Sequence, residues 1–372
     1  MITNDDSYRL RPLKALIIRG PMRAPAEMFF LGASGVANNI VTVDEAGIEV
    51  GRLGKALKRV GALRSEFAFW RLGSEIIEQI NDCDFVWLPD PWMALSQQGS
   101  VLAKRVGKPY VVTVWENIDG HFTTKWPLRH RVKEVLESAK VVHCVTTGSE
   151  QYVAEVSRSA NTVQVYPGVD TSRFAPGSRG GMSRQPHIFL FVARLVEEKG
   201  VRDLVSAFVA ARGILGDGIE LVIVGDGPLR DYVSGNVHDS AGIRYIGQIA
   251  HDQLSTVMAS CHTLVLLSKP RRVGPVEVWR EQFGFVLVEA MACGLSIIGS
   301  DSGAIAEVIG DAGTVLPLGR SLVSQLTMAM VNAARDSDGW FAKSERSRRR
   351  ALTYFDAKVN SAVLWGEIRK VV

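Results

Sequence analysis

Short runs of apolar, often β-branched residues alternate along the chain with longer segments in which apolar residues recur at helical spacing. Continuous apolar runs predict strands that are buried on both faces, as in parallel sheets, and the longer segments predict the helices that cover them. We therefore predict strands at residues 13–19, 40–43, 84–88, 109–115, 141–145, 162–165, 188–193, 219–225, 245–247, 263–268 and 295–300. Helices are predicted at residues 50–60, 92–106, 201–209 and 251–260, and from residue 343 to the end.

Proline and glycine divide this pattern into two halves. The segment Y-P-G-V-D-T-S-R-F-A-P-G (Tyr166–Gly177) reads as extended and irregular, and the S-R-G-G-M-S-R-Q-P after it has no apolar period. Alternating strands and helices on both sides of this break predict an α/β protein with two doubly wound, Rossmann-like domains that face each other across a cleft. We place the first domain at residues 1–167, the linker at 168–183 and the second domain at 184–356.

The composition is that of an ordinary globular protein, with 47% hydrophobic and 22% charged residues among 372. No apolar run approaches the ~20 residues that span a bilayer. The first residues, M-I-T-N-D-D, lack the apolar core of a secretory signal. The four cysteines stand far apart, without the C-x-x-C or Cys/His clusters of zinc sites. We therefore expect a cytoplasmic protein with reduced, buried thiols.

The net charge of +4 admits an anionic ligand, an anionic membrane or nucleic acid as a partner. The basic residues are not interleaved with aromatic ones in any RNA- or DNA-binding motif, which argues against nucleic acid. Residues 125–133 form a basic helical stretch that also carries Trp126. This stretch is interpreted as a solvated helix face, and contact with the inner face of a membrane is the alternative.

The stretch E-Q-F-G-F-V-L-V-E-A-M-A-C-G (Glu281–Gly294) lies between two predicted strands and is predicted to be a loop followed by a crossover helix. Gly284 opens the predicted helix and Gly294 fits the position that ends it. In a mostly helical segment Glu281 and Glu289 are about 12 Å apart along the axis. This spacing suits a ligand with hydroxyls at both ends and an anion at the helix N-terminus between them, such as a nucleotide diphosphate sugar. The alternative is an amphipathic helix with two solvated glutamates.

Two loops that follow predicted strands carry further candidates. Arg194 and Lys199 stand in A-R-L-V-E-E-K-G, where a forked guanidinium and a compact ammonium suit a diphosphate. The alternative is that both are solvated surface charges. Asp226 stands in G-D-G-P, which is either a phosphate-binding turn or a structural turn, since the G-x-G-x-x-G spacing is absent.

One segment resembles the Glu-x7-Glu region of the family-4-type retaining glycosyltransferases, which have the GT-B fold. Its sequence is V-x-W-R-E-Q-F-G-F-V-L-V-E-A-M-A-C-G-L-S-I-I-G-S-D-S-G. The resemblance implies that Glu281 lies near the hydroxyls of the donor sugar, that Glu289 holds the ribose, and that Arg194 and Lys199 contact the diphosphate. It implies a last helix, at about 357–372, that packs back on the first domain. Further donor-side positions implied by it are Gly225, Asp226, Gly247, Ile249, Gly284, Phe285, Val286 and Leu287.

The first domain departs from the family pattern. Many relatives have a histidine directly after the strand that corresponds to 109–115, whereas this chain has Trp115 followed by Glu116 and Asn117. Glu116 and His121 are the catalytic candidates of this loop. The alternative for His121 is an ordinary surface histidine.

The resemblance implies transfer of a hexose from a nucleotide diphosphate sugar to a glycan, lipid or small-molecule hydroxyl, with retention of anomeric configuration. No metal and no cofactor is expected. The Asp-x-Asp motif that holds a metal in the other large glycosyltransferase fold has only a weak counterpart here, because Asp82 and Asp84 precede a predicted strand instead of following one. The alternatives are a nucleotide-sugar epimerase, a phosphorylase-like enzyme on the same fold, or a module that binds an anionic ligand or nucleic acid.

Overall fold

The structure is a computed structural model that describes residues 12–18, 30, 32, 39–42, 48–50, 70–73, 76–177, 186–235 and 242–372. Most of the helix predicted at 50–60 (residues 51–60) and part of the predicted linker (residues 178–183) lie outside the described residues, and Val50 belongs to a strand instead of a helix. None of the helices in the described ranges combines the length and apolarity needed to traverse a bilayer.

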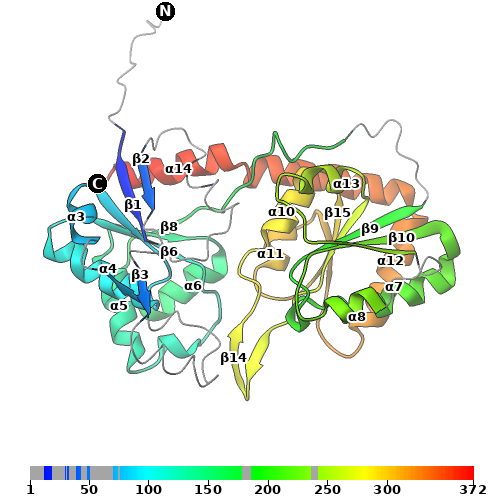
Figure 1. The fold of residues 1–372 in the computed structure, drawn as a ribbon, viewed down its shortest axis with the longest axis horizontal. Coiled ribbons are helices and arrows are strands. Elements are labelled where there is room, and N and C mark those ends of the chain that lie inside the picture. The colour runs from blue at the N-terminus through cyan, green and yellow to red at the C-terminus, as the bar shows by residue number, and fades with distance from the viewer. Residues whose placement is uncertain are drawn as a thin grey trace, which may run out of the picture.

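Two six-stranded parallel sheets, one in each half of the chain, form the framework (Figure 1). The first sheet has the order β2 (Asn39–Thr42), β1 (Lys14–Ile17), β5 (Phe85–Leu88), β6 (Tyr110–Val114), β7 (Val141–Cys144) and β8 (Thr162–Gln164). The second has the order β11 (Ile243–Gly247), β10 (Ile219–Val224), β9 (His187–Val192), β12 (Thr263–Leu266), β15 (Ser296–Ser300) and β16 (Gly313–Leu316). The predicted α/β architecture with two parallel sheets is confirmed.

Helices cover the faces of both sheets. In the first half they are α3 (Ile76–Asn81), α4 (Ala94–Arg105), α5 (Leu128–Ser138) and α6 (Thr147–Val156). In the second half they are α7 (Val201–Leu215), α8 (Arg230–Gly235), α9 (Leu254–Ala259), α10 (Phe285–Ala292), α11 (Ile305–Ile309), α12 (Leu322–Arg335) and α13 (Ser337–Tyr354).

The central strands form because their apolar residues are covered on both faces. All residues of β5, β6, β7, β12 and β15 are buried. Such strands need no polar face, which is why continuous apolar runs located them in the sequence. The four cysteines are buried and form no disulfide with one another, as predicted.

Two short antiparallel ribbons were not predicted. Strand β3 (Ile48–Val50) pairs with β4 (Trp70–Leu72), and β13 (Arg271–Val273) pairs with β14 (Val276–Trp279). Each ribbon has strands of three or four residues without clear alternation of apolar and polar positions. A ribbon this short leaves little periodic signal in the sequence.

The chain passes from one half to the other twice, and the two crossing segments are hydrogen-bonded to each other. Residues 168–169 pass the junction between α13 and α14 (Ala357–Arg369), where Val169 N donates to Phe355 O and Ala357 N donates to Val169 O. A Cβ on Gly168 would stand 2.6 Å from the backbone of Ala357, so only glycine allows this crossing. Asp356 caps α14 by accepting from Lys358 N and Val359 N.

Helix α14 packs on the first sheet, although it follows the second in sequence (Figure 1). The Trp365 ring lies 5.5 Å from that of Trp87 and 5.6 Å from that of Phe85, both in edge-to-face geometry. The C-terminal helix therefore ties the two halves together by apolar burial.

Candidate active site

The carboxyl ends of the strands in the second sheet bring the donor-side candidates to one edge. Arg194 and Lys199 follow β9, Gly225 and Asp226 follow β10, and Gly247 ends β11. Because β9, β10 and β11 are parallel neighbours, the loops after them lie side by side. Ligands of open α/β sheets bind at this edge.

Helix α10 begins and ends where the sequence predicts. Gly284 is its N-cap with φ +81°, a conformation that favours glycine. At the other end Gly294 N donates to Met291 O and Leu295 N to Ala290 O, which is a Schellman motif. The side chain of Leu287 is fully buried and its N–H donates to Gly284 O, so Phe285 and Val286 offer the first amides of the helix.

Lys199 and Glu281 meet beside this helix start. Lys199 Nζ lies 2.5 Å from Glu281 Oε2, and Ser268 Oγ donates to the same oxygen at 2.5 Å. The side chains of Lys199 and Glu281 are only 14% and 9% exposed, so solvent screens their attraction weakly. Lys199 Nζ also lies 4.9 Å from the centroid of the Trp279 ring, a cation–π contact. These contacts fix an ammonium and a carboxylate next to the N-terminus of α10.

Arg194 and Glu289 stand in different surroundings. Arg194 is exposed, and its guanidinium forms no hydrogen bond or ion pair with the residues that the structure describes. Glu289 is 4% exposed, and its Oε1 lies 2.7 Å from His251 Nε2. The sequence predicted neither the burial of Glu289 nor its histidine partner.

The loop at Gly225 is shaped by close backbone packing. A Cβ on Gly225 would stand 1.9 Å from Ala193 O, and Gly225 N donates to Gly247 O. Asp226 Oδ1 accepts from the N–H of the next residue, and Asp226 O accepts from Leu195 N. These contacts favour the structural interpretation of this turn. Ile249 packs against the apolar core of the second half.

The carboxyl edge of the first sheet holds a buried polar cluster after β6. Asp90 Oδ1 accepts from the amides of Trp115 and Glu116, and Glu116 Oε1 accepts from the amides of Asn117 and Ile118. Glu116 is 5% exposed. Burial raises the pKa of Glu116 to about 7, and the negative charge of Asp90 adds to this effect. The hydrogen bonds from the amides of Ile118 and Asn117 act in the opposite direction but are weaker.

His121 belongs to the same cluster. Its Nε2 lies 3.7 Å from Glu116 Oε2, and its Nδ1 lies 2.7 Å from Thr123 Oγ1, which in turn contacts the hydroxyl of Tyr152. Burial lowers the pKa of His121 to about 4, because desolvation penalises the imidazolium. His121 is therefore buried and neutral at pH 7, and the interpretation as a surface histidine is wrong.

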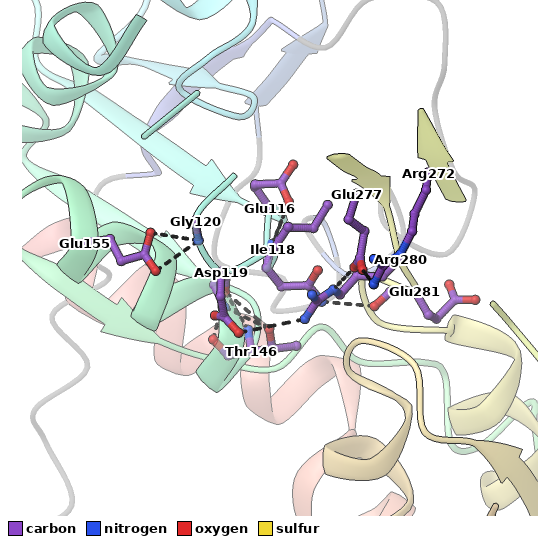
Figure 2. Close-up of polar contacts among 12 residues, drawn as sticks. Glu116, Ile118, Asp119, Gly120, Thr146, Glu155, Arg272, Glu277, Arg280 and Glu281 are labelled. Carbon is purple, nitrogen blue, oxygen red and sulfur yellow. Dashed lines mark hydrogen bonds and ion pairs between the residues drawn. The ribbon is translucent and has the colours of Figure 1, made fainter. Parts of the chain in front are cut away.

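The two edges touch each other. Asn117 Nδ2 donates to Glu281 O at 3.0 Å, and Arg280 Nη1 lies 4.0 Å from Asp119 Oδ2. Figure 2 shows Asp119 facing Arg280 across the boundary, with Glu281 beside them and Glu116 set back in the first half. The Trp115 ring also lies 5.9 Å from that of Phe285. The loop after β6 therefore faces the start of α10.

Four residues of these clusters were missed by the sequence reasoning: Asp90, Ser268, His251 and Trp279. Asp90 stands in the P-D-P turn after β5, Ser268 ends the apolar run of β12, and His251 lies in the loop after β11. Their position after strands of parallel sheets was the signal that could have found them. Within the described ranges, His, Cys, Asp and Glu side chains nowhere gather in groups of three that could hold a metal ion.

Comparisons with known proteins agree with this geometry. Residues 179–322 match the family Glycosyl transferases group 1. A GDP-mannose-dependent α-(1-6)-phosphatidylinositol monomannoside mannosyltransferase of Mycobacterium tuberculosis is 26% identical over 263 residues, which are 66% of this chain and 67% of the relative. An N-acetyl-α-D-glucosaminyl L-malate synthase of Bacillus anthracis is 32% identical over 145 residues, which are 37% of this chain and 34% of that enzyme.

Solved structures share the fold of the whole chain. Anabaena HepE in complex with UDP has a TM-score of 0.72 at 15% identity, with 96% of this chain and 100% of that chain covered. Sucrose-phosphate synthase from Thermosynechococcus elongatus has a TM-score of 0.69 at 17% identity, with 96% and 98% covered. The motif around Glu281, the two parallel sheets and these likenesses converge: residues 179–322 are a group 1 glycosyltransferase region, and the chain has the GT-B fold of nucleotide-sugar-dependent glycosyltransferases.

Proposed function

We propose that this enzyme transfers a hexose from a nucleoside diphosphate sugar to a hydroxyl of a lipid-carried or small-molecule acceptor. The donor lies along the carboxyl edge of the second sheet, in a domain of residues 184–356, and the acceptor approaches from the domain of residues 1–167. The observation that carries this proposal is the fixed group of Lys199, Glu281 and Ser268 at the start of α10.

Each donor-side residue has a role that its surroundings support. Lys199 and Arg194 bind the diphosphate, because they bring positive charge to the edge where the first amides of α10 point. Glu281 orients the sugar hydroxyls from its place between Lys199 and Ser268. Glu289 binds the ribose with the oxygen that His251 leaves available, since a carboxylate accepts several hydrogen bonds.

Glu116 and His121 act as positioning residues in this proposal. Both are buried, and Glu116 holds the amides of Asn117 and Ile118. They thereby fix the loop from which Trp115 and Asn117 reach the start of α10. The leaving diphosphate, stabilised by Lys199 and Arg194, accepts the proton of the acceptor hydroxyl on the face where it departs, which gives retention.

The acceptor class is proposed from the relatives and from the surface of the first half. One relative is named for a phosphatidylinositol monomannoside acceptor and another for L-malate. Lys125, Arg129 and Arg131 are exposed at α5, and Trp126 beside them is 88% exposed. Exposed cations around an exposed indole suit an anionic lipid surface, so we favour a lipid-carried acceptor.

One experiment tests the reaction and its metal independence together. The enzyme is screened with nucleotide sugars in excess EDTA, and the anomeric coupling constant of the product is read by proton NMR. We expect transfer to persist and the donor configuration to be kept, because the charge of the leaving group is met by Lys199, Arg194 and the helix start. Activity that is lost in EDTA and restored by magnesium or manganese would refute metal independence, and an inverted product would refute the front-face mechanism.

A further inference from the structure

The ribbon of β13 and β14 protrudes from the second half with an apolar tip. Val273 is 69% exposed and Val276 is 45% exposed, on either side of the turn at Gly274 and Pro275. Figure 1 shows the ribbon projecting from the body of the protein beside the first half. Two exposed valines at the end of a projecting element are not explained by burial in the core.

The geometry of the turn fixes the direction of these valines. Gly274 has φ +58°, and a two-residue loop that starts with glycine and continues with proline fits a type II′ hairpin turn. Val273 pairs with Val276, so both side chains leave the same face of the ribbon. The next pair, Arg272 and Glu277, forms an ion pair at 3.1 Å. The end of the ribbon therefore presents Val273 and Val276, and the next pair of residues, Arg272 and Glu277, is charged.

The base of the ribbon is joined to the donor site and to the first half. Trp279 lies against Lys199, and Arg280 Nε bonds Glu277 at 2.5 Å while its Nη1 approaches Asp119. Figure 2 shows Arg272, Glu277 and Arg280 in one row beside the loop that carries Asp119. The ribbon thus stands at the boundary of the two halves, next to the place where transfer occurs.

A second apolar point stands on the first half. Phe122 is 45% exposed and Trp126 is 88% exposed, and the exposed Lys125 lies between them in sequence. In Figure 1 the ribbon tip and α5, which begins just after Trp126, both lie along the lower edge of the molecule. Both halves therefore present exposed apolar side chains with exposed cations next to them in the sequence.

We propose that the tip of the β13–β14 ribbon inserts Val273 and Val276 into an anionic lipid surface, beside the contact made by Trp126. This inference rests on the proposed transfer to a lipid-carried acceptor. Arg271 and Arg272 flank the valines and face anionic headgroups, with Arg272 61% exposed. Docking at two points, one on each half, brings the boundary at Asp119 and Arg280 close to the membrane, where a lipid-borne hydroxyl is presented.

A bilayer fits this surface better than a protein partner does. A stable protein interface needs roughly 1,000 Å² or more with a packed centre. The apolar residues here are instead two small points on separate elements, each with cations around it. Shallow insertion of such points, combined with attraction of Lys and Arg to anionic lipid, is the pattern of interfacial binding.

The first test reads insertion directly. Val273→Cys is labelled with an environment-sensitive dye, which reacts at the introduced thiol because the native cysteines are buried. We expect a blue shift of the dye emission with vesicles of equal parts phosphatidylcholine and phosphatidylglycerol, and a much smaller shift with phosphatidylcholine alone. An emission unchanged by the mixed vesicles would overturn the proposal.

The second test measures binding by sedimentation with the same vesicles. The double variant Val273→Ser and Val276→Ser should bind roughly tenfold more weakly than wild type, and Arg271→Ser about fivefold more weakly. The matched controls are Val209→Ser, at a valine that is 54% exposed on α7, and Arg335→Ser, at an exposed arginine that ends α12. Equal binding by ribbon and control variants would overturn the proposal, as would a wild type that does not bind.

Stabilisation by nucleotide separates this proposal from the proposed function. Thermal shifts with UDP and with GDP report the donor site, which the valine variants leave intact. Vesicle binding that fails while one nucleotide still stabilises the protein removes only the ribbon proposal. Failure of both nucleotides to stabilise it counts against the donor site itself.

Discussion

The carboxyl edges of the two sheets face each other, yet they handle charge in opposite ways. On the second sheet Arg194 is exposed, and Lys199 forms an ion pair with Glu281 beside the start of α10. On the first sheet Glu116 and His121 are 5% and 3% exposed. Burial raises the pKa of Glu116 and lowers the pKa of His121, so it favours the neutral form of each. The second edge carries charged side chains at its surface and in an ion pair, whereas burial at the first edge favours the neutral forms of its titratable groups.

This difference fits the roles proposed for the two edges. A diphosphate has to be met by positive charge that is already in place, because electrostatic stabilisation is strongest when the groups need no reorganisation. A positioning loop needs satisfied hydrogen bonds and little water instead, and Glu116 provides these for the amides of Asn117 and Ile118. Five variants test this comparison.

The largest effect is expected in the pH dependence of folding stability at the first edge. The pKa of Glu116 rises from 4.5 to about 7 on folding, so its contribution to the free energy of unfolding is full below pH 4.5 and is lost by about pH 7. The pKa of His121 falls from 6.5 to about 4, so its contribution is full above pH 6.5 and is lost as the pH falls to about 4. In the wild type the two slopes oppose each other between pH 4.5 and 6.5.

Single variants should expose these opposed slopes, which urea denaturation at several pH values would measure. Relative to wild type, Glu116→Gln should gain about 3 kcal/mol of unfolding free energy as the pH rises from 4.5 to about 7. His121→Asn should lose a similar amount between about pH 4 and 6.5. Parallel curves for wild type and both variants would show that neither group is held in its neutral form.

The next largest effect is expected at the second edge. Lys199→Ala should lower kcat/KM by ten- to a hundredfold, because a charge-assisted contact to phosphate contributes about 1.5–3 kcal/mol. Steady-state kinetics with the donor found by screening would measure it. The matched control is Lys370→Ala, at an exposed lysine that caps the C-terminus of α14 and pairs with Glu367. Wild-type kinetics in folded Lys199→Ala would exclude the diphosphate role.

A smaller effect is expected from Glu289→Gln. It should raise the donor KM about tenfold with little change in kcat, because ribose binding is equal in the ground and transition states. Donor titrations of initial rates give both constants. Glu345→Gln, at an exposed glutamate on α13, is the control. A variant with altered kcat and unchanged KM would place Glu289 near the reacting carbon instead of the ribose.

The smallest effect is expected where the edges touch. Asn117→Ala removes one hydrogen bond to Glu281 O, which contributes about 0.5–1.5 kcal/mol, so turnover should fall about threefold. Asn161→Ala removes a bond of the same kind, from an exposed amide to Lys140 O, far from the start of α10. If both variants turn over equally fast, the contact between the edges does not contribute to catalysis.

Much of the fold was predictable because its signals are local. Buried strands such as β6 and β12 show as continuous apolar runs, and the ends of α10 show as Gly284 and Gly294. The β13–β14 ribbon was not predictable, since its strands are short and its tip is exposed. The roles proposed for Glu281, Glu289, Arg194 and Lys199 stay predictions until the variants are measured.

The sequence by itself determined the two parallel sheets, the break between them and the residues of the Glu-x7-Glu motif, because periodicity, turn residues and motif spacing act over short distances along the chain. Only the tertiary structure decided which groups meet. Lys199 reaches Glu281 across 82 positions and Asn117 reaches it across 164, and His251 comes to Glu289 from another loop. Burial at Glu116 and His121 is likewise a property of packing, and desolvation by that packing is what shifts their protonation.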